Sequence, residues 1–144
     1  MVKVVFLDID GVLNDAFNIQ RLMKDEPSLD HLECLKAIID LTGAEIVLTS
    51  TWRLFALSRK IIKNSLAKVG LTFTDRTKEL LKGRTAEINE WLSRHQEVES
   101  FVILDDDWTL LEDFPENTVK TSFFKGLLPE HIEKAVKILN GNIK

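Results

Sequence analysis

The sequence contains only one cysteine and no long apolar segment, and each of these scarcities excludes a class of protein. The single cysteine, Cys34, rules out an internal disulfide and suits a reducing cytosol. No apolar run approaches the roughly 18 residues that a membrane helix needs. The first residues, MVKVVFLDID, place acids directly after a short apolar run, which is wrong for a signal peptide. We therefore expect a cytoplasmic protein that does not associate with membranes.

The chain also lacks an excess of positive charge. It carries 19 basic and 23 acidic residues, for a net charge of −4. This balance argues against a dedicated DNA- or RNA-binding module, which usually has a strong basic excess. One stretch differs: between Ile46 and Thr74 the sequence has five bases and no acid. The five are Arg53, Arg59, Lys60, Lys63 and Lys68. They form either a solvated helix face or a surface that receives an anionic substrate.

Repeats, low-complexity tracts and linkers rich in Pro, Gly or Ser are absent as well. With 144 residues, 44% of them apolar and 29% charged, the composition is that of one globular domain with a single sizeable core. We therefore predict a single domain over residues 1–144.

Short β-branched apolar runs alternate with stretches of helical periodicity along the chain. The predicted strands are Val2–Leu7, Glu45–Thr49, Leu71–Phe73, Phe101–Leu104 and Thr118–Thr121. The predicted helices are Asp30–Leu41, Leu54–Val69, Thr85–His95 and a last one from Pro129 to near Gly141. Strands that alternate with helices predict an α/β domain around a mainly parallel sheet.

Polar side chains follow three of these strands at the point where each one ends. They are Asp8 and Asp10, then Thr49 and Ser50, then Asp105 and Asp106. In parallel α/β sheets, ligands bind beyond the carboxyl ends of the strands. We therefore expect these residues to face one crevice.

Three or four carboxylates that converge within a few ångströms need a compensating cation. A divalent ion with oxygen ligands fits best, and magnesium is the usual one beside phosphate. We expect its ligands among Asp8, Asp10 and one of Asp105 and Asp106, and the residues leave open which of the last two binds.

The D-x-D spacing of Asp8 and Asp10 has its own chemical meaning. At the extended end of a strand, positions i and i+2 point the same way. Asp8 is then placed to attack phosphorus and form an aspartyl-phosphate. Asp10 is placed to protonate the leaving alkoxide and later to activate water. Gly11 lets the chain turn sharply after the strand.

Phosphate also needs donors and a fixed cation. The hydroxyl of Thr49 or Ser50 supplies a donor, and the sequence does not distinguish the two. For the cation we favour Arg84, which directly precedes a predicted helix, with Lys82 as the alternative.

Taken together, FLDIDGVLN, IVLTSTW, a basic residue before a helix and VILDDD resemble the haloacid dehalogenase (HAD) superfamily of phosphohydrolases. These motifs run from Phe6 to Asp107. The resemblance implies a Rossmann-like three-layer sandwich, a nucleophile at Asp8, an acid/base at Asp10 and a Mg²⁺ cofactor. LTSTWR, with RTAEINEWL before VILDD, is further similar to small phosphatase domains associated with nucleic-acid repair.

Two other interpretations of the acidic motifs fail on spacing. An EF-hand loop that began at Asp8 would need Asp or Asn at its fifth place and Gly at its sixth, where this chain has Val12 and Leu13. A receiver domain needs its phosphoacceptor after the third strand, where only Asp75 follows a weak strand.

The substrate is not fixed by these motifs. HAD phosphatases often gate specificity with a cap domain, but the stretches Asn14–Thr42 and Thr51–Glu99 leave room for a minimal cap or none. An open site suits a polynucleotide end or a phosphoprotein, and a nucleotide or small phosphorylated metabolite is the rival. A non-catalytic phosphate- or metal-binding module on the same fold is the alternative of another class.

Overall fold

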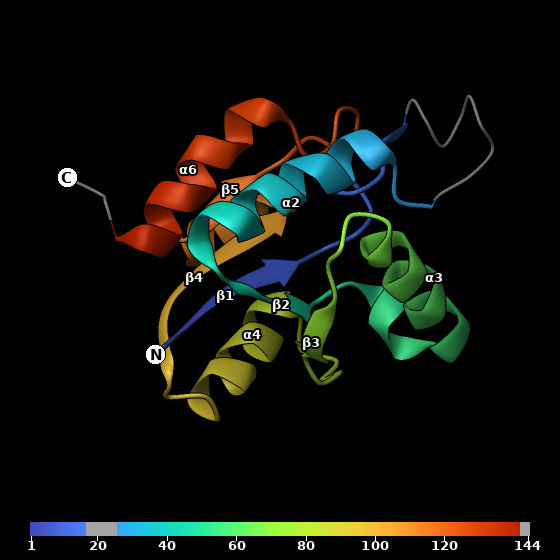
Figure 1. Ribbon diagram of the computed structural model, residues 1–144. Helices are drawn as coiled ribbons and strands as arrows, with labels where there is room; N and C mark the ends of the chain where they lie inside the picture. Colours follow the sequence, from blue (N-terminus) through green and yellow to red (C-terminus); the bar gives the residue numbers. More distant parts are fainter. Residues whose placement is uncertain (17–25, 142–144) are drawn as a thin grey trace.

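The computed structural model describes residues 1–16 and 26–141 and contains one five-stranded sheet in the order β3-β2-β1-β4-β5. The strands are β1 (Val2–Leu7), β2 (Glu45–Leu48), β3 (Phe73–Arg76), β4 (Val98–Asp105) and β5 (Thr118–Lys120). All neighbouring pairs are parallel. The predicted α/β fold with a parallel sheet is confirmed (Figure 1).

Helices cover both faces of the sheet, because the central strands are apolar on both sides. On one face, Val5 and Leu7 belong to a core shared with α2 (Leu29–Thr42), α3 (Ala56–Ala67) and α6 (Pro129–Asn140). On the other, Val4 and Phe6 pack with α4 (Arg84–Ser93) and α5 (Trp108–Asp113). Figure 1 shows α2 and α6 on one side of the sheet and α4 on the other. The molecule is a three-layer, Rossmann-like sandwich.

Three local expectations need correction. The third strand is at Phe73–Arg76 and not at Leu71–Phe73. A short 3₁₀ turn, η1 (Thr51–Leu54), precedes α3, so the helix begins at Ala56 and not at Leu54, and Leu57 is 71% exposed. The helix α5 was not predicted; it begins where Asp107 accepts a hydrogen bond from the Thr109 N–H.

The described residues form no separate cap domain between the strands. Residues 17–25, part of the stretch in which at most two helices were expected, lie outside the described residues. None of the helices in the described part of the chain combines the length and the hydrophobicity that a membrane crossing requires.

Candidate active site

The register of the three central strands brings their polar ends side by side. Leu7 pairs with Leu48 on one side and with Leu104 on the other. The Asp8 N–H donates to the Leu104 carbonyl (3.1 Å), and the Thr49 N–H donates to the Leu7 carbonyl (3.0 Å). The residues after the three strands therefore emerge together at the carboxyl edge of the sheet, as expected.

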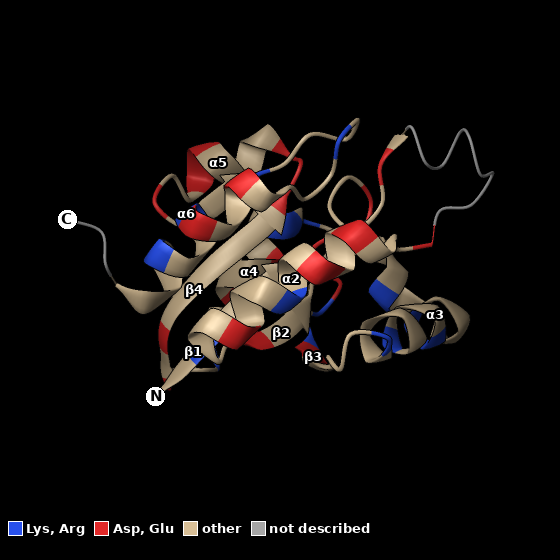
Figure 2. Cartoon of the chain, turned by 45° about the horizontal axis from the view of Figure 1, so that its top comes forward, with Lys and Arg blue, Asp and Glu red and all other residues tan. Residues whose placement is uncertain are grey.

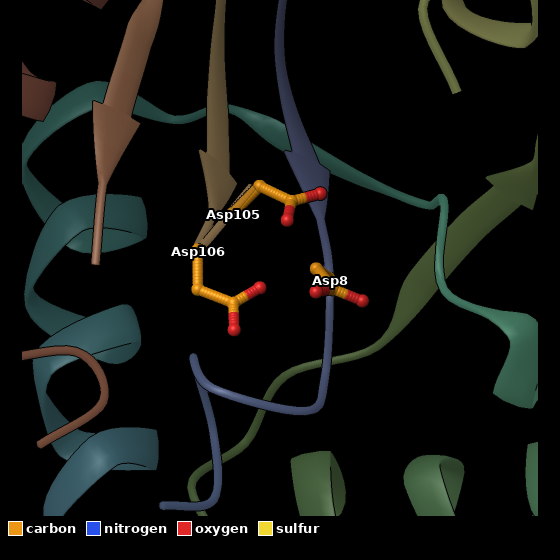
Figure 3. Close-up of side chains that lie close together, drawn as sticks. All are labelled: Asp8, Asp105 and Asp106. Carbon is orange, nitrogen blue, oxygen red and sulfur yellow. The ribbon is translucent and has the colours of Figure 1, made fainter. Parts of the chain in front are cut away.

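Asp8, Asp105 and Asp106 form a compact carboxylate cluster at this edge. Each offers an oxygen within 4.8 Å of the others, and Figure 3 shows the three side chains turned toward a common space. Burial and the neighbouring Asp105 carboxylate raise the pKa of Asp8 well above its usual range. The same two causes raise the pKa of Asp106 to about 6. This crowded negative charge fits a divalent cation with oxygen ligands.

Arg84, at the start of α4, contacts two members of the cluster. Its Nη1 lies 2.7 Å from Asp105 Oδ2 and 3.4 Å from Asp8 Oδ2. Burial lowers the pKa of the guanidinium, but the carboxylates of Asp8 and Asp105 more than offset this, and the pKa is raised above its usual value. The other oxygen of Asp105 accepts from the Asp107 N–H (3.0 Å), so both oxygens of Asp105 are engaged.

Lys82, the alternative cation, is exposed and is not among the residues that line the cleft. Arg84 does line it, together with Asp8, Asp10 and Asp106. Of the two bases considered from the sequence, the fold brings Arg84 into the site.

Asp10 is held apart from the carboxylate cluster by two donors. One oxygen accepts from Asn14 Nδ2 (2.8 Å), and the other accepts from the Trp52 indole N–H (3.2 Å). Asn14 is itself fixed, because its Oδ1 accepts from the Gly11 N–H (3.0 Å). The metal-type cluster found among the described residues does not include Asp10. Its carboxylate instead faces the cleft as a separately oriented group.

Gly11 turns the chain between the two acids. Its φ of +79° is a conformation that favours glycine, and a Cβ at this position would collide with the Asp106 carboxylate. Its carbonyl accepts a hydrogen bond from the buried Thr121 hydroxyl. The glycine therefore allows Asp106 to pack directly against the loop that carries Asp10.

The two candidate hydroxyls lie in different surroundings. Thr49 is fully buried, and its Oγ1 has no hydrogen-bond partner among the described residues. Ser50 lines the cleft, and its Oγ accepts from the Trp52 N–H (3.1 Å), which leaves its own hydrogen to be donated. Both hydroxyls are next to the acids, and the geometry keeps both as candidates.

Arg53 occupies a place that the sequence did not indicate. We expected it on a solvated face or an anion-receiving surface, but it is only 2% exposed. Its guanidinium donates to the carbonyls of Thr49, Ser50, Thr77 and Lys78 at 2.9–3.3 Å. It also pairs with Glu87 at 3.0 Å. The expected surface role of Arg53 is wrong, because the chain ends of β2 and β3 leave carbonyls that this side chain satisfies.

The second oxygen of Glu87 accepts from the Leu80 N–H at 3.0 Å. Since Glu87 is in the first turns of α4, the ion pair joins the segment after β2 to the helix that carries Arg84. Sequence reasoning missed Asn14, Arg53 and Glu87 as parts of the site. Trp52 packs against the core, and its indole also reaches Asp10.

A cleft of about 460 Å³ opens over these residues. Its lining includes Asp8, Asp10 and Asp106 and also Leu54, Glu79 and Leu81. Carboxylates at the carboxyl edge of a parallel sheet, with a cation at a helix start and a D-x-D turn, form the arrangement that the sequence motifs predicted at this edge.

The sequence model of one family matches residues 4–132, and its description is "HAD domain in Swiss Army Knife RNA repair proteins". The chain belongs to this family, and the resemblance stated from its motifs is confirmed. No curated protein and no solved structure matches the chain. The family supports a HAD-type phosphohydrolase associated with RNA repair.

Proposed function

We propose that this domain is a magnesium-dependent phosphatase that removes a terminal phosphate from RNA through an aspartyl-phosphate on Asp8. The observation that carries the proposal is the separation of the acids into two groups. Asp8, Asp105 and Asp106 converge beside Arg84, whereas Asp10 is held alone by Asn14 and Trp52. Nucleophilic and acid–base roles need such different surroundings.

Asp8 and Asp106 are the best candidates to hold Mg²⁺ directly. Both have raised pKa values in the absence of a cation, whereas the oxygens of Asp105 already accept from Arg84 and Asp107. When bound, Mg²⁺ would neutralise charge on the transferred phosphoryl group. It would also keep Asp8 ionised, which an attacking carboxylate requires.

The reaction then runs in two displacements. An oxygen of Asp8 attacks phosphorus, the bond from phosphorus to the ester oxygen breaks, and Asp10 gives its proton to that oxygen. Asp10 next takes a proton from water, which attacks the aspartyl-phosphate and releases inorganic phosphate. The hydrogen bonds from Asn14 and Trp52 fix the Asp10 carboxylate for both transfers.

Arg84 and the hydroxyls of Thr49 and Ser50 would hold the phosphoryl oxygens. Arg84 already lies within 3.4 Å of Asp8, so its guanidinium is close to where negative charge develops. The unpartnered Oγ1 of Thr49 and the available hydrogen of Ser50 are further donors for this group.

The substrate assignment rests on the family and on the open cleft. The family is one of HAD domains in RNA repair proteins, and the described residues place no cap domain over the acids. A site that the described residues leave uncovered admits a polymer end. A free nucleotide or a small metabolite is the competing substrate.

The test is hydrolysis of 5′- and 3′-phosphorylated oligoribonucleotides and of an aryl phosphate, with Mg²⁺ and with EDTA. Turnover that needs metal, Asp8 and Asp10 supports the proposal, and faster turnover of RNA ends than of free nucleotides supports the substrate. Folded protein that binds Mg²⁺ but turns over none of these compounds would instead support the non-catalytic phosphate-binding alternative.

A further inference from the structure

A second hollow opens beside the catalytic cleft. It has a volume of about 290 Å³ and is lined by Thr51, Trp52, Phe55, Ser58 and Ile61. Thr51 lines both the hollow and the cleft, so the two are neighbours. This volume is at the small end of the range of about 300–1,000 Å³ for ligand pockets, and it suits one flat ring better than a whole nucleotide.

The side chain of Trp52 lies between the hollow and the proposed acid–base residue, Asp10. Its indole N–H donates to Asp10, the proposed donor of a proton to the leaving oxygen, and its side chain also lines the hollow. A leaving group that starts at Asp10 is therefore next to Trp52. Phe55, which also lines the hollow, is 64% exposed. A half-buried indole beside an exposed phenyl ring is a surface on which a nucleobase stacks.

The exposed aromatic residues of the described chain share one position in the fold. They are Phe55, Trp108, Phe123 and Phe124, at 40–75% exposure. Phe55 follows β2, Trp108 follows β4, and the Phe123–Phe124 pair follows β5. All four thus lie in segments after the carboxyl ends of strands, at the catalytic edge. Single exposed apolar residues are ordinary, but four aromatics in the segments after the carboxyl ends of strands suit a ligand with several flat rings.

The charge near the hollow is positive, which complements the negative charge of an RNA backbone. The helix α3, which supplies Ser58 and Ile61, carries Arg59, Lys60 and Lys63 and no acid. Figure 2 shows this helix with basic segments and no acidic ones. A phosphodiester backbone that runs from the cleft toward α3 would meet positive potential.

We propose that the site takes the unpaired end of an RNA strand, with the base of the phosphate-bearing nucleotide stacked in the hollow of Trp52 and Phe55. The inference rests on the proposed phosphatase function and adds where the leaving nucleoside binds. An unpaired strand fits better than a duplex, because a terminal base in a duplex must leave its paired partner and its neighbouring base before it can enter the hollow.

The test compares two single-stranded oligoribonucleotides that differ only in the terminal nucleoside that carries the phosphate, one with adenine and one abasic. We expect kcat/KM to be about tenfold higher with the base, the order of one base stack, and mainly through KM. Phe55→Ala should reduce this ratio toward one, and Phe55→Trp should restore it. Leu41→Ala, an exposed apolar residue at the end of α2, is the matched control and should keep the full ratio.

A blunt duplex with the same phosphorylated end should react more slowly than the single strand. An equal kcat/KM for the adenine and abasic ends, or a ratio that Phe55→Ala does not change, would overturn the base subsite while the phosphatase function stands. Failure to hydrolyse any phosphorylated RNA end would instead overturn the function on which the inference rests.

Discussion

Arg53 and Glu87 form a buried ion pair, 3.0 Å from Nη2 to Oε1, between the turn that follows β2 and the first turns of α4. The two residues are 2% and 8% exposed. Neither touches the acids of the site, yet together they fix the segments that carry Ser50 and Arg84. The ion pair therefore links two of the segments that line the cleft.

Arg53→Ala should therefore destabilise the protein strongly. It would leave Glu87 buried without its cationic partner and would remove the guanidinium donors from four backbone carbonyls, of which Ser50 keeps only the Arg53 N–H. Removal of one member of a buried ion pair costs about 3–5 kcal/mol. Urea denaturation measures the loss. Arg94→Ala, which removes the exposed pair with Glu90, is the control and should change stability little. Equal stability of the two variants would contradict the claim that the Arg53–Glu87 pair stabilises these segments.

Arg84 should be needed for turnover and Lys82 should not. Loss of a donor aimed at developing charge lowers kcat by about 10²–10³, and we expect this for Arg84→Ala. The kcat of Arg84→Lys should lie between those of the wild type and Arg84→Ala, because an ammonium keeps the charge but cannot reproduce the planar guanidinium contacts with Asp105 and Asp8. Lys82→Ala is the matched control, and its kcat should stay within about twofold of the wild-type value. Only groups close to the negative charge that develops in the reaction stabilise it strongly. A larger loss in Lys82→Ala than in Arg84→Ala would reverse the assignment.

Gly11→Ala should weaken magnesium binding. The new Cβ would meet the Asp106 carboxylate, and the φ of +79° adds backbone strain of order 1–3 kcal/mol. Gly70→Ala separates the two effects, because Gly70 has a φ of +74° but nothing within 4 Å of the added carbon. Both variants should lose stability, but calorimetric titration should find a weaker Mg²⁺ affinity only in Gly11→Ala. Unchanged affinity there would argue against Asp106 as a ligand.

Stability without metal should depend on the ionisation of Asp106. Its pKa of about 6 in the folded state exceeds the ordinary aspartate value, so the folded protein holds a proton that the unfolded chain has released. The contribution of this group to the free energy of unfolding therefore falls as pH rises from about 4 to about 6. In EDTA, Asp106→Asn should gain stability relative to the wild type as pH rises through this window. With saturating Mg²⁺ at neutral pH, the wild type should instead be more stable than Asp106→Asn. A constant difference between the two proteins at all pH values would show that Asp106 does not titrate in this range.

Much of the scaffold was predictable because local patterns determine it. From Val4 to Leu7, β1 is an apolar run that leads directly into Asp8, and α2 ends at Gly43 with a φ of +72°. The convergence of Asp8 and Asp105 also followed from the rule that parallel strands end at one edge. β3 was misplaced because it is an edge strand that pairs with β2 alone, and its sequence Phe-Thr-Asp-Arg has little apolar character.

The supporting contacts of the site could not be predicted, because they join residues far apart in sequence. Arg53 and Glu87 are 34 positions apart, and Trp52 lies 42 positions after Asp10. No local periodicity distinguishes a buried arginine from the exposed bases around it. The carbonyls that gather after β2 and β3, visible only in the fold, explain why Arg53 turns inward.

The account depends most on covalent transfer of the phosphoryl group to Asp8, and the Asp10→Asn variant allows a direct measurement. An aryl phosphate has a leaving group that needs no proton, so the first displacement should persist in this variant, whereas activation of water should be lost. Intact-protein mass spectrometry after rapid mixing with Mg²⁺ and the aryl phosphate should show one added phosphoryl group, mapped by peptide analysis to Asp8. Turnover retained in Asp8→Asn, or a phosphoryl group found on another residue, would contradict the account.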